Sequence, residues 1–160
     1  GTVWFERSFQ WHPNGNHRTL LYFGAVNYEA YVYINGQQAG YHVGGFTPFN
    51  FDVTDLLKDG ENVLVIKVDN KRRAEAVPTQ IFDWWNYGGI TRDVLLVDVE
   101  PVYIEDYSLQ LTDRERRQLS FTLQLNQPTA GQRVTLNIPE LKFSQQFVTD
   151  AQGVFQRSSR

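Results

Sequence analysis

The sequence has 160 residues, which is enough for one large domain or two small ones. Its formal net charge of −3 gives no electrostatic basis for binding nucleic acid, and its lack of Cys excludes disulfides, thiolate catalysis and Cys-based zinc sites. No stretch approaches the roughly 18 apolar residues that a membrane-spanning helix needs, so we expect neither nucleic acid nor a membrane as a partner.

The first third of the chain alternates between apolar and polar residues in the way that is typical of half-buried strands. We predict strands over Val3–Trp11, Thr19–Val26, Tyr28–Ile34 and Gln37–Val43. The pair Asn35-Gly36 between the last two predicts a hairpin with a type I′ turn, because both residues tolerate positive φ.

The next segment predicts two further strands around one short helical turn. Phe49–Val53 is extended, and Thr54 is placed to cap a turn over Asp55–Lys58. Asn62–Asp69 is apolar on both faces except at Lys67, which favours a position in the middle of a sandwich.

Residues 70–82 form a polar, irregular connection, and a strand is predicted over Asp93–Val99. After Pro101 the texture changes to short, regularly alternating strands, namely Tyr103–Leu111, Gln118–Leu125, Arg133–Ile138 and a weaker one over Phe143–Thr149. The fold class is therefore all-β, with one module over residues 1–100 and a second, smaller β-sandwich over residues 101–160.

The densest group of chemically useful side chains follows the polar connection and has the sequence Asp83-Trp84-Trp85-Asn86-Tyr87-Gly88-Gly89-Ile90-Thr91-Arg92. Two interpretations are open. One is a tight loop whose aromatic residues complete a core, and the other is the edge of a sugar site. Sugar sites combine flat aromatic faces, which cover the apolar side of a pyranose, with polar groups for its hydroxyls.

On the sugar-site interpretation, the substrate-binding candidates are Asp83, Trp84, Trp85, Asn86 and Tyr87. A finer assignment gives the last three of these to packing and loop closure and leaves Asp83 facing outward. Gly88-Gly89 is expected to brace the loop, because glycine permits positive φ and close approach of another chain.

The sequence argues against self-sufficient catalysis. The histidines are His12, His17 and His42, and no third ligand has the spacing of a metal site. There is no nucleophile elbow, phosphate loop or dinucleotide fingerprint, so no catalytic residue, cofactor or metal is assigned. Glycoside hydrolysis needs two carboxylates. Asp52 and Asp55 are interpreted as turn residues and Asp69 and Glu75 as solvated ones, which leaves only Asp83 with aromatic company.

Several runs resemble motifs of family 2 glycoside hydrolases, the β-galactosidases, β-glucuronidases and β-mannosidases. The matching runs are Gly1-x-Val3-Trp4-Phe5-x-Arg7-x-Phe9, Val32-Tyr33-Ile34-Asn35-Gly36-Gln37, His42-x-Gly44-Gly45-Phe46-Thr47-Pro48-Phe49-x-x-Asp52-Val53-Thr54, Gly60-Glu61-Asn62-x-Leu64 and Asp83-Trp84-Trp85-Asn86-Tyr87-Gly88-Gly89-Ile90-x-Arg92. The resemblance implies a galactose-binding-like jelly roll over residues 1–100, followed by a partial immunoglobulin-like sandwich over residues 101–160.

In such enzymes the catalytic acid and nucleophile are glutamates of a later (β/α)₈ barrel, which these 160 residues do not contain. The resemblance implies a parent that hydrolyses terminal β-galactosides or β-glucuronides and forms homo-oligomers. It implies that Asp83 contacts the terminal sugar together with that barrel, and that Arg92 braces the loop. We expect this segment to be inactive alone.

Other expectations concern the limits of the chain and its role. Position 1 is Gly, so we expect a fragment whose compartment stays open, and the sugar and its linkage are not determined. The family's jelly roll usually has an earlier strand, and the second sandwich is expected to be several strands short, so exposed edges are expected. Alternative roles are an autonomous carbohydrate-binding module and a purely structural interaction domain.

Overall fold

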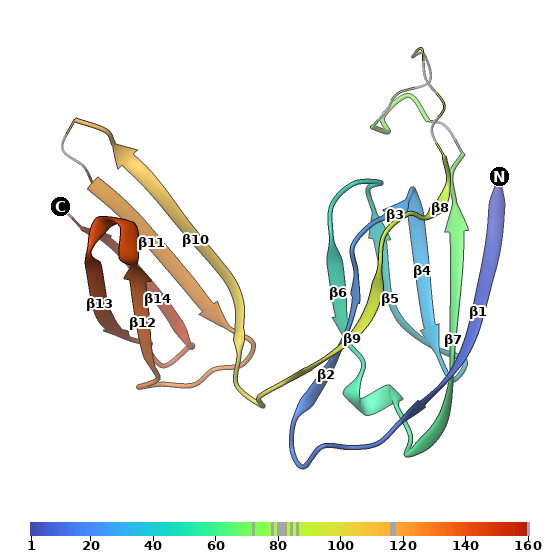
Figure 1. The fold of residues 1–160 in the computed structure, drawn as a ribbon, viewed down its shortest axis with the longest axis horizontal. Coiled ribbons are helices and arrows are strands. Elements are labelled where there is room, and N and C mark those ends of the chain that lie inside the picture. Colours follow the sequence, from blue (N-terminus) through green and yellow to red (C-terminus); the bar gives the residue numbers. More distant parts are fainter. Residues whose placement is uncertain are drawn as a thin grey trace. The chain divides into compact units, whose positions relative to one another are not determined.

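The computed structural model describes residues 1–71, 73–77, 79, 83, 85, 87–115 and 118–159, without the side chains of residues 157–159. The chain divides into two compact units, Gly1–Glu100 and Pro101–Arg160. Antiparallel strands build both units (Figure 1), so the all-β prediction is confirmed. No helix in the described part of the chain has the length and apolarity needed to cross a membrane.

The larger sheet of the first unit has the strand order β1 (Thr2–Trp11), β7 (Gly60–Asp69), β4 (Glu29–Ile34) and β5 (Gln37–Val43). Strand β7 pairs with β1 on one side and with β4 on the other, which confirms its predicted central position. Because side chains alternate between the two faces of a strand, each strand gives one row to the core and one row to the opposite face.

The predicted β4–β5 hairpin is confirmed. Asn35 and Gly36 have φ of 50° and 82°, the signs that a type I′ turn requires. The Asn35 Nδ2 donates to Oδ1 of the fully buried Asn62 at 2.8 Å and to the Leu56 carbonyl at 3.0 Å. The turn is therefore tied to the polar end of the core.

The second sheet of the first unit has the order β6 (Phe49–Asp52), β2 (Arg18–Phe23) and β9 (Val94–Val99). The predicted strand over Thr19–Val26 is wrong as one continuous element. It ends at Phe23, and the chain then enters a separate short pair, β3 (Val26–Asn27) with β8 (Gly89–Ile90). The break is held by Gly24, whose N–H donates to the Asp93 carbonyl at 2.9 Å.

The predicted helical turn is present but its cap is not. A 3₁₀ turn spans Thr54–Leu56, its N-cap is Val53, and no side chain caps it. The Thr54 hydroxyl instead donates to Asp52 at 2.7 Å and accepts from the Thr19 N–H at 2.7 Å. Thr54 therefore joins the turn to β2, because a backbone donor on that strand competes for its oxygen.

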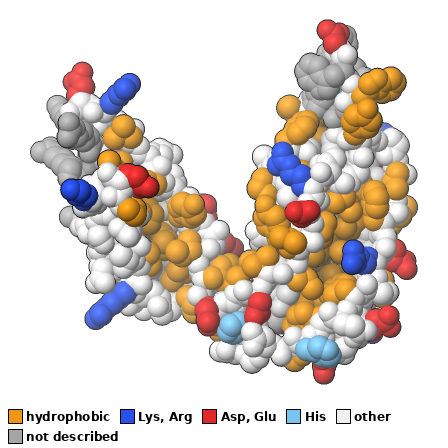
Figure 2. All heavy atoms as spheres, in the orientation of Figure 1, with side chains coloured by type: hydrophobic (Ala, Val, Ile, Leu, Met, Phe, Trp, Pro, Cys, Tyr) orange, Lys and Arg blue, Asp and Glu red, His pale blue; other side chains and the backbone are white. Residues whose placement is uncertain are grey.

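The core of the first unit lies between its two sheets. Its buried members come from strands of both sheets and from residue 53: Leu21, Phe23, Val26, Ala30, Val32, Ile34, Val53, Leu64, Ile66 and Val68. Where the edges β1 and β9 face each other, an apolar groove of about 230 Å³ remains, lined partly by Phe5, Arg7 and Val94. Figure 2 shows exposed hydrophobic side chains on this face. Among the described residues, each edge strand pairs on one side only, as expected.

The second unit contains β10 (Ile104–Asp113), β11 (Gln118–Leu125) and β14 (Val154–Ser159) in one sheet, and β12 (Arg133–Ile138) with β13 (Phe143–Val148) in another. Its core is small and consists of two phenylalanines and two leucines: Phe121, Leu123, Leu125 and Phe147. A 3₁₀ turn over Pro139–Leu141 joins β12 to β13.

Strand β14 has no counterpart among the sequence predictions. Only Val154 and Phe155 at its start are apolar, and polar residues follow. It is an edge strand, and its backbone pairs with β11 in a register that runs from Leu119↔Ser159 to Gln124↔Val154. An edge strand with little apolar alternation gives a weak sequence signal.

Candidate functional site

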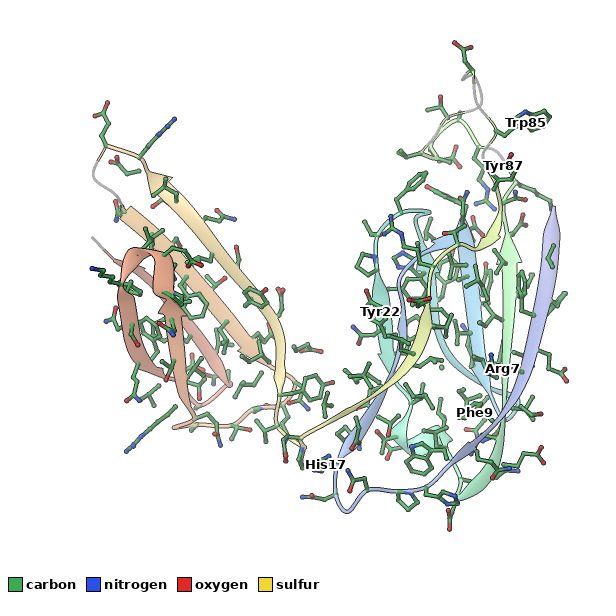
Figure 3. All side chains as sticks on the ribbon, in the orientation of Figure 1. Arg7, Phe9, His17, Tyr22, Trp85 and Tyr87 are labelled. Atoms are coloured by element: carbon green, nitrogen blue, oxygen red, sulfur yellow. The ribbon has the colours of Figure 1, made fainter. Side chains whose placement is uncertain are left out.

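The loop that contains the sugar-site candidates lies between the end of β7 and the start of β8. Figure 3 shows Trp85 and Tyr87 at one end of the first unit, with His17 at the opposite end. The loop lies outside the long strands, because β7 ends at Asp69 and β8 begins at Gly89. Its geometry therefore depends on the contacts that anchor its base.

The base of the loop is anchored through the β3–β8 pair. Asn27 is buried, with 2% of its surface exposed, and its Nδ2 donates to the Tyr87 carbonyl at 2.6 Å. On the other side of β8, the Thr91 N–H donates to the Ala25 carbonyl at 3.1 Å. These contacts fix the backbone on both sides of β8.

The two glycines brace the loop for different reasons. A Cβ at Gly88 would lie 2.2 Å from the Asn70 Nδ2, so this position needs the absence of a side chain. Gly89 has φ of +108°, a conformation that other residues rarely adopt. The contacts support the bracing role that the sequence suggested for this pair.

Arg92 lies where the chain leaves β8. Its Nη1 donates to the Phe46 carbonyl at 3.3 Å, and its Cβ lies 2.8 Å from the position that a Cβ on Gly24 would occupy. The arginine thus connects the exit of the loop to the turn that follows β5. This geometry supports the bracing role that the family resemblance implies.

Three candidate residues of the loop are presented to solvent: Asp83, Trp85 and Tyr87. Trp85 is 80% exposed and Tyr87 is 76% exposed, so assigning these two rings to packing is wrong. The outward position expected for Asp83 is confirmed. Trp84 and Asn86 lie outside the described residues.

Sequence reasoning missed two buried polar residues below the loop, Asn27 and Glu29. Glu29 is 4% exposed and forms an ion pair with Arg73 in the connection after β7. A buried carboxylate requires a partner, so this pair holds the connection against the sheet. Both polar residues sit next to Tyr28 in a stretch of strand, and nothing in their spacing signals a long-range partner.

The three histidines are dispersed. His12 Nδ1 lies 2.6 Å from Asp59, whereas His17 Nδ1 lies 3.0 Å from Asp98. His42 stacks on Phe49 with 4.0 Å between ring centroids, and burial lowers its pKa against a backbone hydrogen bond with Gly44. Within the described residues, no group of three or more His, Asp or Glu side chains could hold a metal ion.

The remaining carboxylate candidates have structural partners. Arg18 donates to Asp52 at 2.8 Å and to Asp55 at 3.1 Å, which agrees with their interpretation as turn residues. Burial raises the pKa of Asp52, but the hydrogen bonds from Arg18 and Thr54 outweigh it and the net shift is downward.

The expectation that Asp69 is solvated is wrong. Its side chain is 13% exposed and lies 3.7 Å from the Lys71 Nζ. The Lys71 backbone N–H lowers the pKa of Asp69, while burial opposes the shift. Glu75 is exposed, in agreement with its prediction.

A small cavity lies at the base of the loop. This pocket has a volume of about 110 Å³ and is lined by Gly1, Val3, Val68, Asn70, Gly88 and Gly89. Sites for small molecules usually occupy about 300–1,000 Å³. The exposed side chains above this pocket therefore offer one wall of a site.

Relatives with similar sequences carry glycosidase names. A putative β-glucuronidase of Formosa agariphila is 35% identical over 94% of this chain, which covers 18% of that protein. A β-galactosidase of Clostridium acetobutylicum is 38% identical over 57% of this chain, which covers 10% of that protein. The chain thus spans less than a fifth of the length of either relative.

Solved structures agree with these relatives. A β-glucuronidase from an uncultured Clostridium species matches 99% of this chain with a TM-score of 0.70 and 28% identity, and this chain covers 29% of that structure. The family model for the sugar binding domain of glycosyl hydrolases family 2 matches residues 1–100, the first compact unit. The chain belongs to glycosyl hydrolase family 2 and contains the family's sugar binding domain.

Proposed function

We propose that this chain is a non-catalytic β-sandwich portion of a family 2 glycosidase, which supports a catalytic barrel and supplies it with one substrate-contacting loop. The observation that carries the proposal is the contrast within the loop. Its base is fixed by Asn27, Gly88 and Arg92, whereas Asp83, Trp85 and Tyr87 face solvent. Holding polar and aromatic groups on a rigid base is how proteins orient a ligand at low entropic cost.

The parent reaction is hydrolysis of a terminal β-glycoside with retention of configuration. The relatives are named β-glucuronidases and β-galactosidases, and this range of substrates is carried over as part of the proposal. Retaining hydrolysis needs two carboxyl groups about 5–5.5 Å apart. Asp52 and Asp55 share Arg18, and Asp69 pairs with Lys71, so we assign the catalytic pair to the barrel. Homo-oligomerisation of the parent is part of the same proposal.

The role of Asp83 is tested by Asp83→Ala in the complete enzyme, assayed on β-glucuronide and β-galactoside substrates. We expect kcat/KM to fall about 10- to 100-fold, as for loss of a charge-assisted hydrogen bond to a sugar hydroxyl. Glu75→Ala removes another exposed carboxylate from the same connection and should leave kcat/KM unchanged. Both variants should keep the wild-type Tm. Unchanged kinetics in the Asp83 variant would show that the loop does not contact substrate.

One observation favours an autonomous carbohydrate-binding module as a second candidate, because Trp85 is exposed without help from another domain. Calorimetric titration of this chain with the monosaccharides galactose, glucuronate and mannose, which occupy a single-sugar site, separates the two. The main proposal expects no saturation up to millimolar sugar. Saturable binding that Trp85→Ala abolishes would favour the module instead.

A further inference from the structure

The outer face of the four-stranded sheet carries a line of aromatic side chains. Pairing places Trp4 of β1 opposite Lys67 of β7, Lys67 opposite Tyr31 of β4, and Tyr31 opposite Tyr41 of β5. These four residues, called here the aromatic row, cross the whole sheet in a single register (strand order in Figure 1). With strands 4.7–4.9 Å apart, the row is about 14 Å long.

The two outer rings of the aromatic row are exposed, and the ring of Tyr31 between them is half-buried. Trp4 is 59% exposed and Tyr41 is 44% exposed, and both belong to edge strands of the sheet. The solvent face of an antiparallel sheet is ordinarily polar, because its apolar residues are used on the core face. A row of three rings on that face therefore calls for a ligand.

The centre of the aromatic row carries a positive charge. The Lys67 ammonium lies 4.9 Å from the centroid of the Tyr31 ring and 5.9 Å from that of the Trp4 ring. No ion pair to Lys67 is formed by the described residues, whereas two carboxylates one row away, Asp69 and Glu29, are paired with Lys71 and Arg73. The cation between the rings keeps donors for a ligand.

On the other side of the aromatic row from Asp69 and Glu29, the acidic side chain of Glu6 disfavours a bound anion. Glu6 of β1 pairs with Val65, next to the aromatic row, and approaches Lys67 diagonally without forming an ion pair. Tyr33 stacks against Trp4, with 6.4 Å between centroids, and extends the aromatic surface on that side. Glu6 thus provides a variant that should act in the opposite direction to Lys67.

We propose that the aromatic row is a second saccharide-binding surface, separate from the Asp83 loop, which takes an oligosaccharide that contains uronic acid. The rings of Trp4, Tyr31 and Tyr41 cover the C–H faces of successive sugar units, and the Lys67 ammonium binds a uronate carboxylate. Aromatic rings supply the apolar contact, and the charge complementarity selects the acidic sugar.

The test is calorimetric titration of this chain with two tetrasaccharides that share one backbone, β-1,4-linked oligoglucuronate and cellotetraose. We expect the acidic sugar to bind about tenfold more tightly, the size of a charge-assisted hydrogen bond. Lys67→Gln should remove that preference. Lys58→Gln, which removes an exposed lysine from the connection that precedes β7, should retain it.

Three further variants test the sign of the charge effect, the location of the site and the need for an aromatic ring. Glu6→Gln should tighten binding of the acidic sugar about two- to threefold, because an exposed like charge is removed. Asp83→Ala should leave binding unchanged, since it belongs to the other site. Trp4→Ala should abolish binding, with its Tm measured in parallel.

If Trp4→Ala fails to fold, an NMR titration of the wild-type chain with the acidic tetrasaccharide tests the role of Trp4 instead. The Trp4 indole signal should shift on titration, whereas the signal of Trp11, whose Nε1 donates to Thr19, should not. Four results would overturn the proposal: no binding up to about 10 mM sugar, equal binding of the two tetrasaccharides, shifts at Trp85 in place of Trp4, or a dimer in sedimentation whose formation Trp4→Ala abolishes.

Discussion

At the scale of single residues, the loop owes its shape to groups that carry no chemistry of their own. Asn70 fills the space above Gly88, and the φ of +108° at Gly89 turns the chain into β8. These constraints act on the backbone at the base of the loop, and the rings of Trp85 and Tyr87 stay exposed. The glycine pair was suggested by the sequence as a brace, whereas the contacts that require it come from elsewhere in the chain.

His42 gives the first unit a dependence on pH. Burial lowers its pKa, so the folded state disfavours the protonated ring. The stability that this residue contributes is therefore complete above the unfolded pKa of about 6.5 and is lost as the pH falls through the folded value.

We predict that the free energy of unfolding decreases between about pH 7 and pH 5, and that His42→Gln reduces this slope. Urea unfolding at each pH measures it. A slope that is the same in the His42 variant and in the wild type would contradict the assignment.

Asp52 and Asp69 extend the pH dependence into more acidic solution. Hydrogen bonds lower both pKa values below the usual 3.8 despite burial. The stability from these carboxylates is present above their unfolded pKa and is lost as the pH falls through the lower folded values. As the pH falls, the loss of stability from His42 therefore starts first, and the loss from these two carboxylates starts at a lower pH.

At the scale of elements, two-residue alternation was sufficient to predict the long strands. It predicted β4 and β5, while the two apolar faces of Asn62–Asp69 predicted the central position of β7 and the Asn35-Gly36 pair predicted the hairpin. The pair of β3 and β8 was missed, since two residues are too few to show a period. That pair is also the element that anchors the loop, so the sequence predicted the candidate loop but not its structural support.

The anchoring role of β3 and β8 predicts the effect of Asn27→Ala. Losing the hydrogen bond to the Tyr87 carbonyl should cost about 1 kcal/mol, mostly as local opening of the loop base. Hydrogen exchange should therefore accelerate at the amides of Gly89, Ile90 and Thr91. Asn14→Ala, at an exposed asparagine that binds Asp98, is the matched control and should leave these amides unchanged. Equal exchange in both variants would count against the anchor.

At the scale of the whole molecule, two separate hydrophobic cores accompany the division at residue 100. The family model covers the first unit, and the relatives extend far beyond both units. The first unit presents its loop side chains above a pocket of only about 110 Å³. An anchored loop base with exposed aromatic side chains is what the proposal of half a sugar site expects.

The most direct test of that claim is hydroxyl-radical footprinting of Trp85 and Tyr87 in the complete enzyme, with and without glucuronate or galactose. Both rings are largely exposed in this chain and should be oxidised readily in it. We predict that adding the sugar protects them in the complete enzyme and has no effect on the isolated chain. Oxidation of the complete enzyme that does not change with sugar would contradict the claim and would leave the loop a purely structural contact.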